Sequence, residues 1–180
     1  KGFSYVDVII AIFILMVGIL AMVSAITANL MRMYETEKRV IAKQTALSTI
    51  ESIISAKEIA RTDIIEGWVS IGNIGNNPVN GVPKGIFENG WCPIRADAGW
   101  DGIVGTIDDA CPTGSPCVVD GRTPNTSEEM KGFDRQILIE NVDDPERPGS
   151  NSRRRITVTV RYGLNQIFRQ EVVTTMLTDY

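Results

Sequence analysis

The sequence predicts an α+β fold in which one long N-terminal α-helix packs on a small antiparallel β-sheet head. Two observations carry this prediction. Residues 8–31 form an apolar run of 24 residues without a charge, and no glycine or proline interrupts the chain from there to residue 66. Apolar and polar side chains then alternate over residues 156–162, which is typical of a half-buried strand.

The first predicted part, residues 1–31, is a hydrophobic helix. At about 1.5 Å per residue, its apolar run is long enough to cross a bilayer core of roughly 30 Å. On length and composition alone, the plainest interpretation is a transmembrane helix that anchors the chain in a membrane.

The second predicted part, residues 32–62, continues the helix in amphipathic form, so that one helix covers roughly residues 3–60. Val40, Leu47, Ile50 and Ile54 lie close to one helical face and are expected to face the head. Charged residues occupy the opposite face: Glu35, Lys38, Arg39, Lys43, Glu51 and Lys57.

The third predicted part, residues 63–180, is the globular head. Its first half is rich in glycine, proline and asparagine, which indicates loops with one short strand near residues 68–71. Strands are expected over residues 133–141, 156–162 and 168–178. The simplest arrangement is an antiparallel meander of three or four strands that crosses the helix.

Composition narrows the class of protein. The chain has 180 residues, a net charge of −4 and no histidine. The absence of histidine removes the usual general base and the histidine-dependent catalytic and zinc sites, so the chain is not expected to be an enzyme. Acidic residues outnumber basic ones after residue 60, and therefore nucleic-acid binding is not a required activity.

The N-terminus carries a pattern that suggests processing. Asp7 lies just inside the apolar segment, where an unpaired carboxylate costs a few kcal/mol. If the chain is cut between Gly2 and Phe3, Asp7 becomes the fifth residue of the mature protein. The new α-amino group of Phe3, in the same chain or in a neighbour, is then its natural partner.

These residues, KGFSYVDVIIAIFIL from Lys1 onward, closely resemble the prepilin cleavage and methylation motif of type IV pilins and type II secretion pseudopilins. In that motif a basic residue precedes the glycine of the cut site, the following phenylalanine is N-methylated, and an acid stands at mature position five. Here the acid is Asp7, where glutamate is usual. Residues 15–22 resemble minor, or accessory, pilins. The likeness covers about 30 residues, and the rest of the chain is similar only in layout.

The resemblance implies a structural role. The chain would be cut by a prepilin peptidase, assembled by inner-membrane machinery and packed with other copies or other pilins into an extracellular filament. It would lie in the inner membrane before assembly and at the cell surface afterwards. A minor pseudopilin of a type II secretion system is an alternative within this class. A membrane-anchored binding module is the rival from another class.

An aspartate-rich loop suggests a calcium site. Four carboxylates fall within 13 residues that contain no basic side chain: Asp97, Asp101, Asp108 and Asp109. Ca²⁺ accepts six to eight oxygen ligands, and glycine-punctuated aspartate loops suit it. The segment is similar in character to the calcium loop of the major type II secretion pseudopilin. Asp101, Asp108 and Asp109 are the favoured ligands, and a solvated acidic turn is the alternative.

Three cysteines bracket this loop, and in an exported protein they favour a disulfide. Since the number is odd, one thiol is left over or pairs between chains. A bond from Cys92 to Cys111 or Cys117 is preferred, because it would join the ends of the loop. The local alternative joins Cys111 to Cys117.

Two shorter motifs complete the candidate sites. Asn125 begins an N-x-[ST] triplet, which is a possible glycosylation site. Residues 153–155 are three consecutive arginines before a strand. Such a run most often is a solvated sheet edge that discourages pairing with other sheets, and binding to DNA or an acidic neighbour is the alternative.

Overall fold

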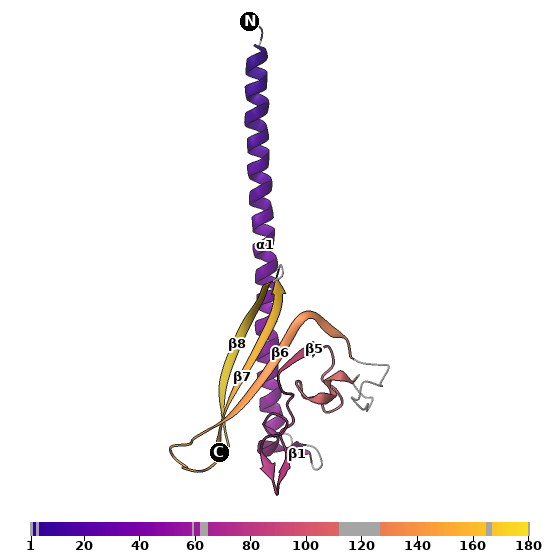
Figure 1. Ribbon diagram of the computed structural model, residues 1–180, viewed down its shortest axis with the longest axis vertical. Coiled ribbons are helices and arrows are strands. Elements are labelled where there is room, and N and C mark those ends of the chain that lie inside the picture. The colour runs from indigo at the N-terminus through magenta and orange to yellow at the C-terminus, as the bar shows by residue number, and fades with distance from the viewer. Residues whose placement is uncertain are drawn as a thin grey trace. The chain divides into compact units, whose positions relative to one another are not determined.

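The computed structural model (Figure 1) describes residues 2, 4–58, 60–61, 65–111, 127–164 and 167–179. The chain divides into two compact units, Lys1–Arg39 and Val40–Tyr180. Helix α1 (Tyr5–Glu58) contributes its first part to one unit and its last part to the other. The predicted long helix is thereby confirmed.

The first unit is the beginning of α1 and has no core of its own. Every described side chain from residue 4 to residue 34 is exposed. Its large apolar side chains range from 46% exposed at Val8 to 79% at Tyr5. The helix therefore presents apolar surface on all sides.

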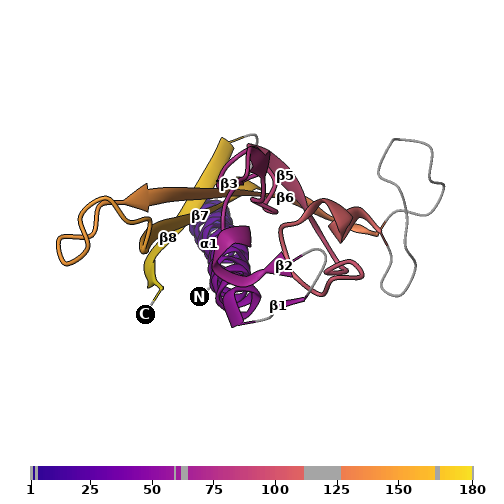
Figure 2. The same cartoon turned by 90° about the horizontal axis from the view of Figure 1, so that it is seen from below.

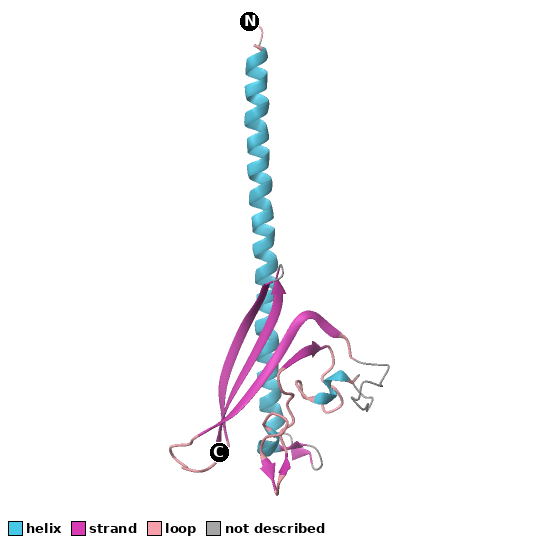
Figure 3. Cartoon of the chain, viewed as in Figure 1, coloured by secondary structure: helices cyan, strands magenta, loops and turns pink. Residues whose placement is uncertain are grey.

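The second unit contains the end of α1, short strands and one larger sheet (Figure 3). Its further elements are β1 (Ala60–Arg61), β2 (Ile65–Glu66), the 3₁₀ helix η1 (Gly67–Ser70), β3 (Pro78–Val79), β4 (Val82–Pro83), β5 (Trp91–Arg95), the 3₁₀ helix η2 (Ile107–Ala110), β6 (Glu129–Val142), β7 (Arg153–Leu164) and β8 (Ile167–Thr178). The sheet has the antiparallel order β5-β6-β7-β8, whereas β1 with β2 and β3 with β4 form two separate pairs. This α+β arrangement confirms the predicted fold class.

Strand β7 supplies the sheet with most of its buried apolar surface. Ile156, Val158, Val160 and Tyr162 are each at most 2% exposed, as their alternation predicts. The runs predicted on either side of β7 are the strands β6 and β8. Because β7 lies between them and pairs with both along its length, its inward side chains form the centre of the core.

The end of α1 packs on one face of this sheet, as the view from below shows (Figure 2). The buried helix residues are mostly small: Ala42, Ala46, Thr49, Ile50, Ile53 and Ala56. The predicted core-facing stripe was therefore wrong except at Ile50, since Val40, Leu47 and Ile54 are 39–48% exposed. Ile50 and Ile53 are buried beside the smaller residues, so both small and large side chains of the helix belong to the core of the head.

The strand predicted near residues 68–71 was also wrong, because this segment is the 3₁₀ helix η1 followed by a turn. Side chains bond several of its carbonyl groups, and backbone N–H groups, among them that of Ile86, bond the Ser70 carbonyl. The Asn77 amide donates to the carbonyl oxygens of Val69 and Ile71 at 3.2 and 2.9 Å. Buried backbone groups need hydrogen-bond partners, and here the Asn77 side chain provides the bonds that a neighbouring strand would otherwise make.

Truncation of the β7 core should destabilise the head strongly. Ile156→Ala is expected to lower the free energy of unfolding by about 2–5 kcal/mol, because it leaves a cavity in a fully buried site. Urea denaturation of the full chain in detergent micelles, followed by tryptophan fluorescence, measures this loss. Leu138→Ala is the control, since Leu138 is 47% exposed on β6 and should cost under about 1 kcal/mol. Equal losses would contradict the assignment of the core.

Candidate functional site

The predicted processing residues lie at the start of α1. Asp7 accepts a hydrogen bond from the Ser4 backbone N–H at 3.2 Å, and its own N–H donates to the Ser4 carbonyl at 3.0 Å. An acid three residues after a serine at a helix start is half of a capping box, and its charge favours the positive end of the helix dipole. Sequence analysis missed this cap although the Ser-x-x-Asp spacing signals it. Gly2 is exposed, Phe3 lies outside the described residues, and the pairing of Asp7 with an amino group stays a prediction.

The exposed apolar surface of α1 is the second candidate site. By length and composition, the helix can cross a membrane. In the second unit, Val40, Leu47 and Ile54 follow one another at intervals of seven residues and are all exposed. We call these three residues the α1 stripe. Residues seven apart lie nearly on one line along a helix, so these three side chains point to the same side of α1.

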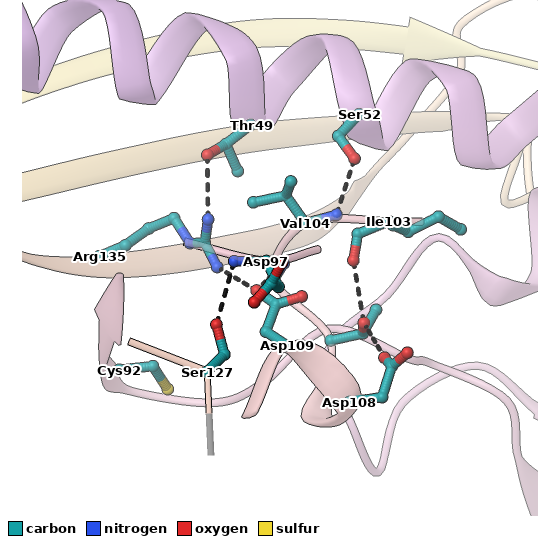
Figure 4. A network of polar contacts seen from close by, with 12 residues as sticks. Thr49, Ser52, Cys92, Asp97, Ile103, Val104, Asp108, Asp109, Ser127 and Arg135 are labelled. Atoms are coloured by element: carbon teal, nitrogen blue, oxygen red, sulfur yellow. Dashed lines mark hydrogen bonds and ion pairs between the residues drawn. The ribbon is translucent and has the colours of Figure 1, made fainter. Parts of the chain in front are cut away.

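The aspartate loop is held together by its own carboxylates (Figure 4). Asp101 accepts from the Ile103 N–H at 2.6 Å, and Asp108 accepts from the Asp101 N–H at 3.0 Å. The Thr106 hydroxyl lies between them, 3.1 Å from Asp101 Oδ2 and 2.5 Å from Asp108 Oδ1. Gly99 permits this closure, because its φ is +63° and a β-carbon there would lie 2.3 Å from Asp108 Oδ2.

One hydroxyl hydrogen cannot satisfy both carboxylates, and this affects the protonation of Asp101. Burial, with the nearby charge of Asp108 as a smaller contribution, raises the pKa of Asp101 from 3.8 to about 6. The hydrogen bonds from Ile103 and Thr106 oppose this change but do not cancel it. Asp101 therefore titrates near pH 6 in the folded chain.

Asp109 forms a buried ion pair with Arg135 on β6. Its Oδ2 lies 2.9 Å from Arg135 Nη2 and accepts from the Gly105 N–H at 2.8 Å, and both side chains are at most 5% exposed. Burial nevertheless raises the pKa of Asp109, because Asp109 Oδ1 is buried and has no hydrogen-bond partner. Arg135 Nη1 also donates to the Thr49 hydroxyl of α1 at 3.3 Å.

A second contact joins the loop to the helix. The Val104 N–H donates to the Ser52 hydroxyl at 2.8 Å (Figure 4). Together with the bond from Arg135 to Thr49, it places polar helix residues directly over the loop. The loop is therefore built into the packing of helix on sheet.

The described residues do not form the predicted calcium site. No group of three or more acidic, histidine or cysteine side chains within them is arranged to hold a metal ion. Asp101, Asp108 and Asp109 instead accept hydrogen bonds from the loop itself, and the Asp97 N–H bonds the Ser127 hydroxyl at 3.0 Å. These carboxylates have a structural role in the observed loop, and calcium binding stays a prediction.

The preferred disulfide from Cys92 was wrong. Cys92 lies on β5 with a free thiol, and its Sγ is 3.7 Å from the Asn89 carbonyl oxygen. Burial and the neighbouring Glu88 raise the pKa of this thiol to about 11, which makes it a poor nucleophile at neutral pH. Cys117 and Asn125 lie outside the described residues, so the bond between Cys111 and Cys117 and the glycosylation site stay predictions.

The buried ion pair should matter far more than an exposed one. Arg135→Met leaves the Asp109 charge buried alone and is expected to cost about 3–5 kcal/mol of unfolding free energy. Arg155→Met is the matched control, because Arg155 lies 3.8 Å from Glu140 and both side chains are half-exposed. Its loss should stay below about 1 kcal/mol in the same urea titration. Similar losses for the two variants would refute the structural importance of the pair.

The titration of Asp101 predicts a pH dependence of stability. Because its pKa is higher in the folded chain than the ordinary 3.8, the folded state binds this proton more tightly. The stabilisation of the folded state by this proton is complete below pH 4 and is lost as the pH rises through about 6. The melting temperature of the wild type should therefore fall over this interval relative to that of Asp101→Asn. Parallel melting curves for the two proteins from pH 3.5 to 7 would contradict the raised pKa.

Comparison with known proteins identifies no relative. No protein-family model, no curated protein and no solved structure matches the chain. What the chain does must therefore be inferred from its helix, its loop and its head.

Proposed function

We propose that the chain is a structural subunit of a type IV pilus-like filament at the cell surface. In this proposal α1 lies in the inner membrane before assembly and packs against the helices of other subunits afterwards. The observation that carries the proposal is the apolar surface of α1, which runs from Tyr5 to Tyr34 and is exposed throughout.

Water is an unfavourable environment for this surface. Exposed apolar area costs about 25 cal/mol per Å², so a helix with large apolar side chains on every side requires lipid or protein around it. Lipid alone would satisfy residues 8–31 and make the helix a simple anchor. A feature that separates a filament subunit from a simple membrane anchor must therefore lie outside residues 8–31.

The α1 stripe supplies that feature. Val40 follows Met31 by nine residues, or about 13 Å of helix, so Val40, Leu47 and Ile54 lie outside a membrane crossed by residues 8–31. A simple anchor gives no reason for exposed apolar residues at seven-residue spacing there. Packing against the helix of a second subunit does, since it removes the stripe from water.

The N-terminal motif supports the same proposal. Its resemblance to the prepilin motif points to a cut between Gly2 and Phe3, and the cap places the Asp7 carboxylate against the Ser4 N–H, one residue from the new terminus. A lone carboxylate within hydrocarbon costs about 2.5–3.5 kcal/mol. An α-amino group from the same or a neighbouring subunit would remove much of this cost.

The N-terminus of the mature protein tests the processing step. Mass spectrometry of the chain from its native cells should find an N-terminal Phe3 that carries one methyl group. A mature protein that retains residues upstream of Phe3 would refute the filament proposal and favour a membrane-anchored module. Among filament subunits, abundance in sheared surface material separates a repeating subunit from a minor pilin or pseudopilin.

The α1 stripe can be tested separately. Leu47→Glu should reduce filament yield at least tenfold, because it places a charge in the helix contact. Ser48→Glu is the control, since it introduces the same side chain at an exposed position about 100° around the helix from Leu47. Head stability and membrane insertion should be unchanged in both variants, as Leu47 is 43% exposed. Wild-type filament yield from Leu47→Glu would contradict a role for the stripe.

A further inference from the structure

The head contains a cavity away from the aspartate loop. Its volume is about 540 Å³, within the range of small-molecule sites, and it lies beside η1, the β3–β4 pair and the segment between β6 and β7. Its lining includes Trp68 and five polar or charged residues: Asn77, Asn141, Arg147, Arg154 and Asp179.

Arg154 forms the charged wall of this cavity. It belongs to the arginine run expected to be solvated, yet it is only 3% exposed, so that expectation was wrong for this residue. Its Nη1 donates to the carbonyl oxygens of Trp68 and Ile71, and its Nε donates to Asn141 Oδ1 at 3.2 Å. Its guanidinium carbon lies 4.3 Å from the centre of the Trp68 ring. All of these partners are neutral.

Among the described residues, no anionic group contacts the charged end of Arg154. No carboxylate of the described residues forms an ion pair with it, and Asp179 acts only from a greater distance. Burial accordingly lowers the pKa of Arg154 to about 10. Arg135, the other buried arginine in this argument, lies 2.9 Å from Asp109. Since buried charges are normally paired, the cavity wall is suited to receive an anion.

The remaining charges fix the expected charge of that anion. Arg147 and Asp179 are both exposed and line the same cavity, so their opposite charges balance. Among the described residues that line the cavity, the surplus is the single positive charge of Arg154. A monoanion such as a carboxylate would neutralise this charge, whereas a phosphate dianion would leave one negative charge in excess.

Two amide side chains are oriented to bind neutral polar groups. The Asn77 Nδ2 donates to the carbonyl oxygens of Val69 and Ile71, which leaves its Oδ1 as an acceptor. The Asn141 Oδ1 accepts from Arg154, which leaves its Nδ2 as a donor. An acceptor and a donor on the wall suit hydroxyl groups, which can serve in both ways.

We propose that this cavity binds a uronic-acid residue, with the sugar carboxylate on Arg154 and its hydroxyl groups on Asn77 and Asn141. The carboxylate supplies the missing anion, and the cavity has room for a monosaccharide. The site is contained in the second unit and does not depend on filament assembly.

Calorimetric titration of the full chain in detergent micelles tests the ligand class. Galacturonate should bind at least tenfold more tightly than galactose, which lacks the charge. It should also bind more tightly than inorganic phosphate and than N-acetylalanine, a carboxylate without the sugar hydroxyls. Equal binding of galactose, tighter binding of phosphate or N-acetylalanine, or no heat with galacturonate at millimolar concentration would overturn the proposal.

A charge-supplying variant tests the role of Arg154. Asn141→Asp keeps the acceptor for Arg154 Nε but adds a carboxylate, so it should weaken galacturonate binding at least tenfold without lowering the melting temperature. Gln170→Glu is the control, because it adds the same charge at an exposed position on β8. Unchanged galacturonate binding by Asn141→Asp would overturn the proposal. The ligand comparison above uses the wild-type chain and holds even if the variant is unstable.

Discussion

The close packing of α1 on the sheet is the contact on which the rest of the head depends. Ala42, Ala46 and Ala56 are completely buried and belong to the same core cluster as the inward side chains of β7. The same part of the helix carries Thr49 and Ser52, which bond Arg135 and the aspartate loop. A larger residue at an alanine position would push the helix away and break the polar contacts together with the apolar ones.

Two buried arginines give the head its polar interior, and their environments differ. Arg135 is paired with Asp109, so its charge holds the loop, the sheet and the helix together. Arg154 donates to carbonyl and amide oxygens and stacks on Trp68, so within the described part of the chain its charge is hydrogen-bonded but not paired with a carboxylate. The first arrangement serves stability. The second leaves a positive charge at a cavity, which is why we assign ligand binding to it and not to the loop.

The elements with strong periodicity were predictable from the sequence. The helix was predicted from a long run without glycine or proline, β7 from its alternation, and β6 and β8 from their β-rich composition, and all four were confirmed. The short elements were not predicted. The segment near Trp68 has the residues of a strand, but its carbonyl groups accept hydrogen bonds from Asn77, a few residues later, and from Arg154, which is distant in sequence.

The residues of the aspartate loop were predictable from the sequence, but the hydrogen bonds and ion pair that their carboxylates form were not. Asp101, Asp108 and Asp109 are predicted as ligands because four carboxylates without a basic neighbour suggest a cation. The positive charge comes instead from Arg135, 26 residues beyond Asp109, and Thr106 joins the other two carboxylates, and neither contact follows from the sequence pattern. The Asp7 cap, by contrast, involves residues three apart and could have been predicted.

The sequence by itself determined a long helix that is apolar throughout its first half, a β-rich C-terminal half and the motif at residues 2–7, because each depends on neighbouring residues alone. Only the tertiary structure decided which helix face is buried, and that face holds three alanines together with Thr49, Ile50 and Ile53. It also decided that Arg154 is buried with no carboxylate of the described residues in contact with it, since burial depends on segments that fold together from distant parts of the chain.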